Sequence, residues 1–420
     1  MLATVAGSGL LCGAGCLNRE SESDPSPPGP DDVDCDPADH PSLATRPSDG
    51  SWEITRGNQQ RTGATSVVKP LGLAEMGEWK VTELVSHSSL YIPAIVDGTV
   101  YCNDGDSTLY AVDGMTGETH WTLNLNGIFT PLVTADTVYT FGVDTLLHAI
   151  DRESGEHRWI RQLDSETRID TLPLVAGENV IVGHERGLRD ETQGWFTAVD
   201  MRCGSERWSF ATPKGESPQG LATDGSAVYA ATEQHLYAVD TDEGDHQWRI
   251  KLPEDVSFDY RPALLCAGNT IVGGGENGYL VAIDRNDGSI RWTTRDDLYA
   301  KHFPTAVADK VFVVERETEN VIALNLQTGA REWIYRGVDF NYSVPPTYVS
   351  GYLYGIEGSS PMLALNAKNG GKHAESPLPS INGTHLDMVE ELAITPAGIF
   401  IHSHRSEGGN PDYVHRLVPA

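Results

Sequence analysis

The sequence predicts an all-β fold, an eight-bladed β-propeller of four-stranded antiparallel blades in which an N-terminal strand closes the ring with C-terminal strands. Three observations lead to this prediction. One phrase recurs seven times at intervals of 38 to 49 residues, each copy is flanked by the same short strand signals, and unmatched strands remain at both ends. A period of this length, filled by strands and turns alone, is typical of stacked sheet units.

The recurring phrase consists of Ala, an aliphatic residue, Asp or Asn, three variable residues, Gly, three more variable residues and Trp. Its copies lie at residues 111–121, 149–159, 198–208, 238–248, 282–292, 323–333 and 364–374. The Asp or Asn can accept hydrogen bonds from backbone N–H groups across a tight turn. The Gly suits the turn position that needs a positive φ. The phrase therefore predicts a strand, a tight turn and the beginning of the next strand.

A tryptophan ends six of the seven copies, and a further tryptophan precedes the first unit. A blade has two apolar faces and cannot bury either alone, so a large ring near the outer strand can pack on the next blade. Such a ring buries about 150–250 Å². We expect a structural docking role for all seven of these residues: Trp79, Trp121, Trp159, Trp208, Trp248, Trp292 and Trp333.

Closure of the ring is predicted from the two ends of the chain. Complete units begin at Pro93, Pro131, Pro173, Pro218, Pro262, Pro304 and Pro346. Three strand signals follow, at residues 392–395, 399–402 and 413–418, without a fourth, whereas residues 77–81 form a fourth strand without the first three. Joining both sets gives an eighth blade and removes the exposed strand edges of an open array.

The recurring phrase resembles the blade signature of the eight-bladed propellers built from pyrroloquinoline-quinone-like (PQQ-like) repeats. The segment Trp52–Gly63, with its W…RGN…RTG pattern, resembles the segment that often opens secreted members. The resemblance covers about residues 51–420 and implies the propeller fold. It leaves function open, because this fold hosts both dehydrogenases and non-catalytic lipoproteins that hold protein assembly machinery together.

The N-terminal region indicates an exported lipoprotein. Residues 1–16 form a short apolar leader that ends in a lipobox-like Gly13–Cys16, and residues 17–50 form an acidic, Pro-rich tether before the propeller at 51–420. The tether has too few large apolar residues to pack a core. We expect a lipid on Cys16 to anchor the chain at the outer face of the cell membrane. Two N-glycosylation sequons, at Asn341 and Asn382, suit export.

The charge of the chain is strongly negative, with 60 acidic and 30 basic residues and a net charge of −30. This excess argues against a nucleic-acid partner, because phosphates are bound by Lys and Arg. Two interpretations of the acidic surface remain. It can serve only to keep the protein soluble, or it can be an adaptation to high salt, where repulsion among carboxylates is screened. We favour salt adaptation, and with it we expect a haloarchaeal source.

The positions of the cysteines limit which disulfides can form. Cys102, Cys203 and Cys266 fall in the predicted blades one, three and five. Blades that are not neighbours are too far apart for the short Cα separation of a disulfide. We therefore expect no bond among these three, whereas Cys35 on the tether could reach one of them.

Candidate ligand-binding residues lie in the loops that enter each blade and converge on the mouth of the central funnel. In this set Asp170 could act as a base, Arg261 as a clamp and His302 as a proton carrier. The alternative is a hydrated rim that binds nothing. The candidates are Tyr91, Thr130, Asp170, Tyr260, Arg261, His302, Tyr342 and His385.

Three functions compete at this stage. We favour a non-catalytic binding or scaffold module with a protein partner and no cofactor, because two insertions, at residues 184–193 and 405–412, are expected on one face. The first alternative is a PQQ-dependent alcohol or sugar dehydrogenase. The resemblance implies that such an enzyme needs calcium, a disulfide between adjacent cysteines and a tryptophan at the quinone, and only Trp195 is available away from the repeat column and the N-terminal segment. The second alternative is a small-ligand or glycan binder.

Salt adaptation predicts that stability depends on ionic strength. Thermal unfolding measured by circular dichroism should shift to higher temperature as KCl rises from dilute buffer towards about 1 M, where the Debye length falls to about 3 Å. A protein that is already at full stability in dilute buffer would contradict this interpretation.

Overall fold

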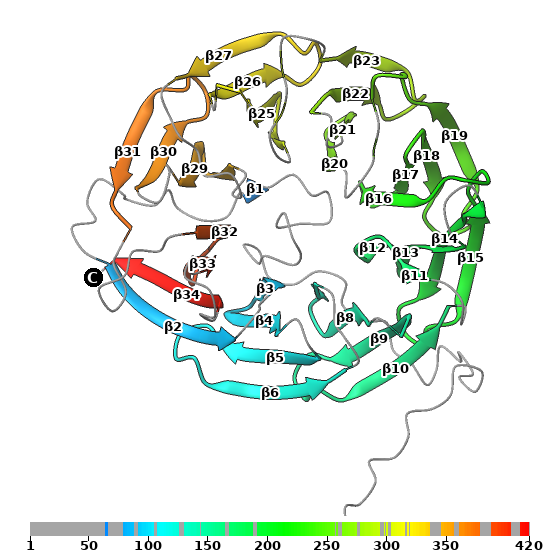
Figure 1. Cartoon of the computed structure of the whole chain (residues 1–420), viewed down its shortest axis with the longest axis horizontal. Coiled ribbons are helices and arrows are strands. Elements are labelled where there is room, and N and C mark those ends of the chain that lie inside the picture. Colours follow the sequence, from blue (N-terminus) through cyan, green and yellow to red (C-terminus); the bar gives the residue numbers. More distant parts are fainter. Residues whose placement is uncertain are drawn as a thin grey trace, which may run out of the picture.

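The computed structural model is a closed ring of eight sheets (Figure 1). It describes residues 64–65 and 79–419 apart from 88–90, 105–106, 126–129, 143, 164–167, 188–190, 257, 259–262, 275–277, 295–297, 299, 301–303, 316, 319, 337–345, 357–360, 379–387 and 405–411. Strands and turns build this part of the chain, which contains no helix long and apolar enough to cross a membrane. The predicted all-β, eight-bladed architecture is confirmed.

In blades 1, 2 and 4 to 7, four strands that follow one another in the chain run from the axis outwards and pair antiparallel with their sequence neighbours. In blade 3 the first two strands both pair with the third. Blades 1 and 2 consist of β3 (Tyr91–Val96), β4 (Thr99–Asn103), β5 (Thr108–Asp113), β6 (Thr119–Asn124), β7 (Leu132–Val133), β8 (Thr137–Phe141), β9 (Leu146–Asp151) and β10 (His157–Gln162). Blades 3 and 4 consist of β11 (Arg168–Ile169), β12 (Leu174–Ala176), β13 (Asn179–Arg186), β14 (Gln193–Asp200), β15 (Glu206–Ala211), β16 (Pro218–Thr223), β17 (Ala227–Thr232), β18 (His235–Asp240) and β19 (His246–Lys251).

The second half of the ring repeats this plan. Blades 5 and 6 consist of β20 (Ala263–Ala267), β21 (Thr270–Gly274), β22 (Leu280–Asp284), β23 (Ile290–Thr293), β24 (Thr305–Val307), β25 (Lys310–Val314), β26 (Val321–Asn325) and β27 (Arg331–Tyr335). Blade 7 consists of β28 (Thr347–Val349), β29 (Tyr352–Ile356), β30 (Met362–Asn366) and β31 (Lys372–Ser376), and β1 (Ala64–Thr65) pairs parallel with β28 on its axial side.

Blade 8 closes the ring with strands from both ends of the chain. It consists of β32 (Met388–Thr395), β33 (Gly398–His404), β34 (Asp412–Pro419) and, outermost, β2 (Trp79–His87). The antiparallel ladder between β2 and β34 runs from the pair Trp79 and Pro419 to the pair His87 and Asp412. The predicted pairing of one N-terminal strand with three C-terminal strands is therefore confirmed (Figure 1).

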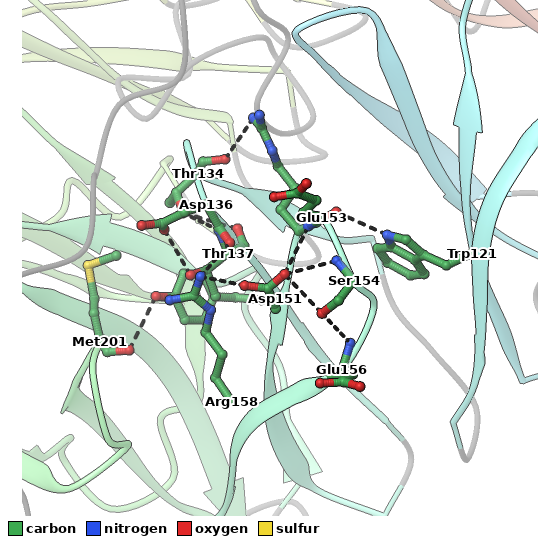
Figure 2. Close-up of polar contacts among 12 residues, drawn as sticks. Trp121, Thr134, Asp136, Thr137, Asp151, Glu153, Ser154, Glu156, Arg158 and Met201 are labelled. Atoms are coloured by element: carbon green, nitrogen blue, oxygen red, sulfur yellow. Dashed lines mark hydrogen bonds and ion pairs between the residues drawn. The ribbon is translucent and has the colours of Figure 1, made fainter. Parts of the chain in front are cut away.

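The turn within each phrase is fixed by its acidic or amide residue, as predicted. In blade 2, Asp151 Oδ1 accepts hydrogen bonds from the backbone N–H groups of Glu153 and Ser154, at 3.1 and 2.9 Å, and from the Ser154 hydroxyl at 3.0 Å (Figure 2). Gly155 completes the turn with a φ of 75°, a value that L side chains rarely adopt. The other six column glycines also have positive φ.

Each column tryptophan docks on the following blade in two ways. Its ring lies against the column glycine of that blade, so a Cβ atom at Gly155 would come within 2.7 Å of the Trp121 ring. Its indole N–H also donates to the backbone carbonyl that follows the column Asp or Asn, as Figure 2 shows for Trp121. The six bonds run from Trp121 to Arg152, Trp159 to Met201, Trp208 to Thr241, Trp248 to Arg285, Trp292 to Leu326 and Trp333 to Ala367, at 2.8 to 3.1 Å.

Trp79 does not occupy the position that the sequence comparison assigned to it. In blade 1 the third residue after the Gly98 turn, Tyr101, pairs with Ala111, which pairs with Trp121. In blade 8 the third residue after Gly398 is Ile401. Ile401 pairs with His415, and His415 pairs with Glu83, so Glu83 has the position that corresponds to Trp121. Trp79 pairs with Pro419 instead, and the Glu83 carbonyl lies 3.3 Å from a Cβ built on Gly117. The register of Trp79 therefore differs from that of the column tryptophans, and its docking role stays a prediction.

In the described part of the chain, both seams of blade 8 are filled by apolar side chains. The seventh phrase ends at Ala374 rather than Trp, and the seam between blades 7 and 8 is an aliphatic cluster that includes Leu392 and Ile401. At the other seam, the Phe400 ring lies 3.3 Å from a Cβ built on Gly114 of blade 1. Blade 8 is thus held by general apolar packing and by its own strand ladder.

Cys102, Cys203 and Cys266 form no disulfide with one another, as expected from the separation of their blades. Cys102 and Cys266 are buried free thiols, whose pKa burial raises to about 12. Cys203, in the turn between β14 and β15, is disulfide-bonded, and its partner lies outside the described residues. Cys35, which could reach one of the three, also lies outside them.

The docking contact predicts a large loss of stability on truncation. Trp159 is 1% exposed and donates to the Met201 carbonyl at 2.8 Å, so Trp159→Ala should cost about 3–5 kcal/mol. Trp159→Phe keeps most of the apolar contact and should cost less, because it loses mainly a hydrogen bond worth about 1 kcal/mol. Urea unfolding followed by fluorescence measures both. Met115→Ala, at a residue 62% exposed, is the control; equal losses in all three variants would contradict the docking role.

Candidate functional site

The funnel loops share one face of the ring. Because successive strands are antiparallel, the segments that enter each blade and the turns between second and third strands lie together on a face that we call the entry face. The Asp–Gly turns lie on the opposite face. Of the predicted funnel residues, Tyr91 begins β3, Thr130 is buried just before Leu132, and Asp170 lies between β11 and β12. The remaining five fall outside the described residues: Tyr260, Arg261, His302, Tyr342 and His385.

Asp170 is held in place by an unusual extension of blade 3. Residues 184–193, which we expected to be an inserted loop, mainly lengthen the hairpin of β13 and β14 as far as the pair Arg186 and Gln193. The short strand β11 pairs with the lengthened part of β13, and the backbone N–H of Asp170 donates to the Gly183 carbonyl at 2.9 Å. The second predicted insertion, at 405–412, lies almost entirely outside the described residues.

Asp170 and Glu185 flank one arginine. The Arg168 guanidinium lies 2.8 Å from Asp170 Oδ1 through Nε and 2.5 Å from Glu185 Oε1 through Nη2. The Glu185 side chain is only 4% exposed. The outer oxygens, Asp170 Oδ2 and Glu185 Oε2, are also buried, and neither has a hydrogen-bond partner among the described residues. Two carboxylates thus share one guanidinium and keep one unsatisfied oxygen each.

Burial and charge together perturb the ionisation of Asp170. Its pKa is raised from 3.8 to about 7, first by burial and then by the neighbouring charge of Glu185, while Arg168 acts in the opposite direction. Glu233 of blade 4 raises this pKa further. Such a perturbed carboxyl marks a functional-site candidate, because buried like charges otherwise destabilise the fold.

Close packing of blade 4 brings more carboxylates to the same seam. A Cβ at Gly183 would lie 2.5 Å from Pro218 Cβ, and one at Gly194 would lie 2.6 Å from Pro218 Cδ. The absence of side chains at these two glycines therefore allows the first strand of blade 4 to lie against the extended hairpin. Glu216 lies two residues before that strand, with its carbonyl 3.0 Å from a Cβ built on Gly194, and Glu233 lies in the turn after β17, where its charge acts on Asp170. We call Asp170, Glu185, Glu216 and Glu233 the carboxylate cluster.

The blade 4 half of the cluster is fully hydrogen-bonded. Glu216 accepts from the Thr232 hydroxyl at 2.5 Å and from His235 Nδ1 at 2.9 Å, and Arg249 donates to His235 Nε2 at 2.9 Å. Glu233 accepts from the Ser217 backbone N–H at 2.9 Å and the Gln219 amide at 2.8 Å. This half is therefore rigid, and the unsatisfied oxygens lie on the blade 3 side.

The cluster is rich in carboxylates and can attract cationic groups, and the Thr232 hydroxyl donates to Glu216 within it. The described residues contain no group of three or more His, Cys, Asp or Glu arranged to hold a metal ion. Sequence reasoning found Asp170 but missed Glu185, Glu216 and Glu233, whose proximity depends on the extended hairpin and the seam packing.

The residues present do not fit the quinone site that the PQQ-like resemblance implied. The chain has no adjacent pair of cysteines. Trp195 lies in β14, the third strand of blade 3, where its ring stacks on His184 at 5.7 Å. It is therefore away from the axial strands, where a quinone in the funnel would need a flat partner.

Comparison with known proteins identifies the family. The PQQ_2 family, described as "Outer membrane protein assembly factor BamB", matches residues 74–250 and 232–398. The chain belongs to this family. An assembly factor BamB of Shewanella oneidensis is 32% identical over 179 residues, which are 38% of this chain and 44% of that relative. The match thus spans less than half the length of the relative.

Solved structures share the propeller fold at low identity. The crystal structure of BamB from Moraxella catarrhalis has 17% identity and a TM-score of 0.56, over 80% of this chain and 98% of that one. The quinohemoprotein alcohol dehydrogenase from Comamonas testosteroni has 14% identity and a TM-score of 0.62, over 87% and 80%. At these identities the likeness concerns the fold, which assembly factors and dehydrogenases have in common.

The raised pKa of Asp170 predicts a pH-dependent cost of folding. Between about pH 4 and pH 7, Asp170 is still protonated in the folded state but already ionised in the unfolded state. The free energy of unfolding of the wild type therefore decreases as pH rises through this range. Asp170→Asn should be more stable than the wild type above pH 7, by on the order of 1–4 kcal/mol. The difference should shrink towards pH 4.

Urea unfolding at several pH values, in buffer with a chelator, tests this expectation. Glu178→Gln removes an exposed carboxylate from the same blade and serves as the control. A difference between wild type and Asp170→Asn that stays constant from pH 4 to pH 8 would contradict the assigned ionisation.

Proposed function

We propose that this protein is an exported, lipid-anchored propeller that acts as a non-catalytic binding or scaffold module for a protein assembly at the outer face of the cell membrane. The observation that carries the proposal is the family match, which extends from residue 74 to residue 398 and so includes strands of all eight blades. Relatives from Shewanella oneidensis and Yersinia pestis are both named outer membrane protein assembly factor BamB.

The entry face of blade 3 is the surface we propose for the protein partner. The hairpin of β13 and β14 extends beyond the ordinary blade length, and half-buried Trp195 lies on it, stacked on His184. Rigid aromatic anchors of this kind are enriched among residues that dominate binding energy. The carboxylate cluster on the same face adds negative charge, which favours a partner with a basic surface.

Export and anchoring rest on the N-terminal motif and on one covalent feature. Cys16 in its lipobox would carry the lipid, and residues 17–50 would span the distance to the ring. The disulfide on Cys203 supports an exported location, because disulfides persist mainly in oxidising compartments. The sequons at Asn341 and Asn382 and the acidic surface agree with an exterior, salty environment.

Partner capture tests the scaffold function. Tagged full-length protein, crosslinked on native membranes and purified, should recover a defined protein partner. Trp195→Ala should lower that recovery several-fold, because it removes the proposed anchor. Met115→Ala is the matched control, since it removes an exposed apolar side chain from the opposite face. No partner above the level of an unrelated acidic protein would overturn the proposal, as would dye reduction with alcohols or sugars after addition of the quinone and calcium.

Lipid anchoring has a separate test. Mass spectrometry of the membrane-bound protein should find Cys16 as a lipid-modified N-terminus, and Cys16→Ser should release the protein from membranes. An intact Met1 on mature protein would exclude the anchor while leaving the scaffold function open.

A further inference from the structure

The phrase turn of blade 3 is covered where its equivalents in the other blades are open. Cys203, in the turn between β14 and β15, is only 3% exposed. The residue at the same place in each of the other six phrases is exposed, and size does not explain the difference, because Ser154 is no larger than a cysteine. These exposed equivalents are Thr116, Ser154, Glu243, Asp287, Thr328 and Asn369. The turn of blade 3 therefore has a cover that the other six turns lack.

The covered residue also carries a covalent bond. Cys203 is disulfide-bonded, whereas Cys102 and Cys266 are free thiols. Of the six cysteines in the sequence, the ones that remain as partners are Cys12, Cys16 and Cys35. Under the proposed function, on which this inference rests, the sulfur of Cys16 carries the lipid, and Cys12 belongs to the leader that is removed ahead of it. Cys35 is then the partner that remains.

We propose that Cys35 forms the disulfide with Cys203 and so ties the tether to the Asp–Gly-turn face of blade 3. A disulfide keeps the two Cα atoms within about 7 Å of each other, so the bonded segment supplies the cover over the turn. The bond forms by thiol–disulfide exchange with a disulfide carrier of the exported compartment. Two S–H bonds are lost and one S–S bond is made, and the carrier takes up the two electrons and two protons and becomes a dithiol.

This bond determines which face of the ring lies near the membrane. Without it, the lipid on Cys16 is joined to the ring through the 48 residues up to β1 at Ala64, which can extend to about 160 Å. With it, the 19 residues from Cys16 to Cys35 reach at most about 65 Å and span about 25 Å on average. The entry face lies one strand length further away, about 20 Å. The turn face of blade 3 is therefore held towards the membrane, and the proposed partner surface on the entry face points away from it.

Disulfide mapping of the full chain tests the bond. Protein purified from membranes with its free thiols blocked, and digested without reductant, should yield a peptide pair that joins Cys35 to Cys203, and reduction should separate the pair. Cys35→Ser and Cys203→Ser should each add one free thiol that reacts with a maleimide in urea, and circular dichroism checks that both variants fold. Cys266→Ala, at a buried free thiol, is the matched control and should keep the peptide pair. A free Cys203, or one bonded to any other cysteine, would contradict the proposal.

Energy transfer to the membrane tests the orientation. A donor dye is placed either on Glu243→Cys, exposed in the phrase turn of blade 4, or on Glu191→Cys, exposed in the β13–β14 hairpin on the entry face. The buried thiols Cys102 and Cys266 do not react in the folded protein. On vesicles that contain an acceptor lipid, transfer in the lipidated chain should be several-fold stronger from Glu243→Cys, and Cys35→Ser should reduce this difference while the protein stays bound.

The contrary outcomes separate this inference from the proposed function. Equal transfer from both sites in the chain that retains Cys35 would overturn the orientation. Absence of a lipid on Cys16 would overturn the anchoring and the orientation together, whereas the peptide map would still decide whether Cys35 and Cys203 are bonded.

Discussion

The contact between each column tryptophan and the glycine of the following blade is the interaction on which the ring depends. It explains why the phrase needs both residues: the glycine supplies a positive φ and also leaves room for the ring, as Gly155 does for Trp121. The indole N–H then satisfies a carbonyl of the same turn, so each blade fixes the turn of its neighbour. Repetition of one local contact converts seven marginal sheets into a continuous array, in which stability is shared through nearest-neighbour interfaces.

Blade 8 obeys a different rule, because the chain enters and leaves there. Among the described side chains, its seams are packed by apolar groups such as Phe400 against Gly114. The ladder of β2 with β34 completes the blade and covers the outer edge of β34, which would otherwise be exposed. Blades 1 to 7 are therefore joined by the same tryptophan contact. Blade 8 is held together by strand pairing between distant parts of the chain.

Most of the fold was predictable because its determinants are local and repeated. The turn residues, the glycine conformation and the strand count follow from the phrase itself, and closure follows from counting strands at the ends. The register position of Trp79 was not predictable, because the pairing of β2, which has a bulge between Glu83 and Val85, depends on tertiary contacts. Asp170 was found as a loop residue, but its grouping with Glu185 and Glu233 follows from Gly183 and Gly194 packing on Pro218, which no local pattern encodes.

The terminal strand β2 also sets how the molecule responds to mechanical load. Tension on the chain ahead of Trp79, directed along the strand, acts lengthwise on a nine-residue strand that is bonded to β34. In this shear geometry the ladder bonds share the load, whereas peeling a strand from its end breaks them one at a time. Load applied along β2 itself therefore passes directly into its ladder with β34, where the two ends of the chain meet.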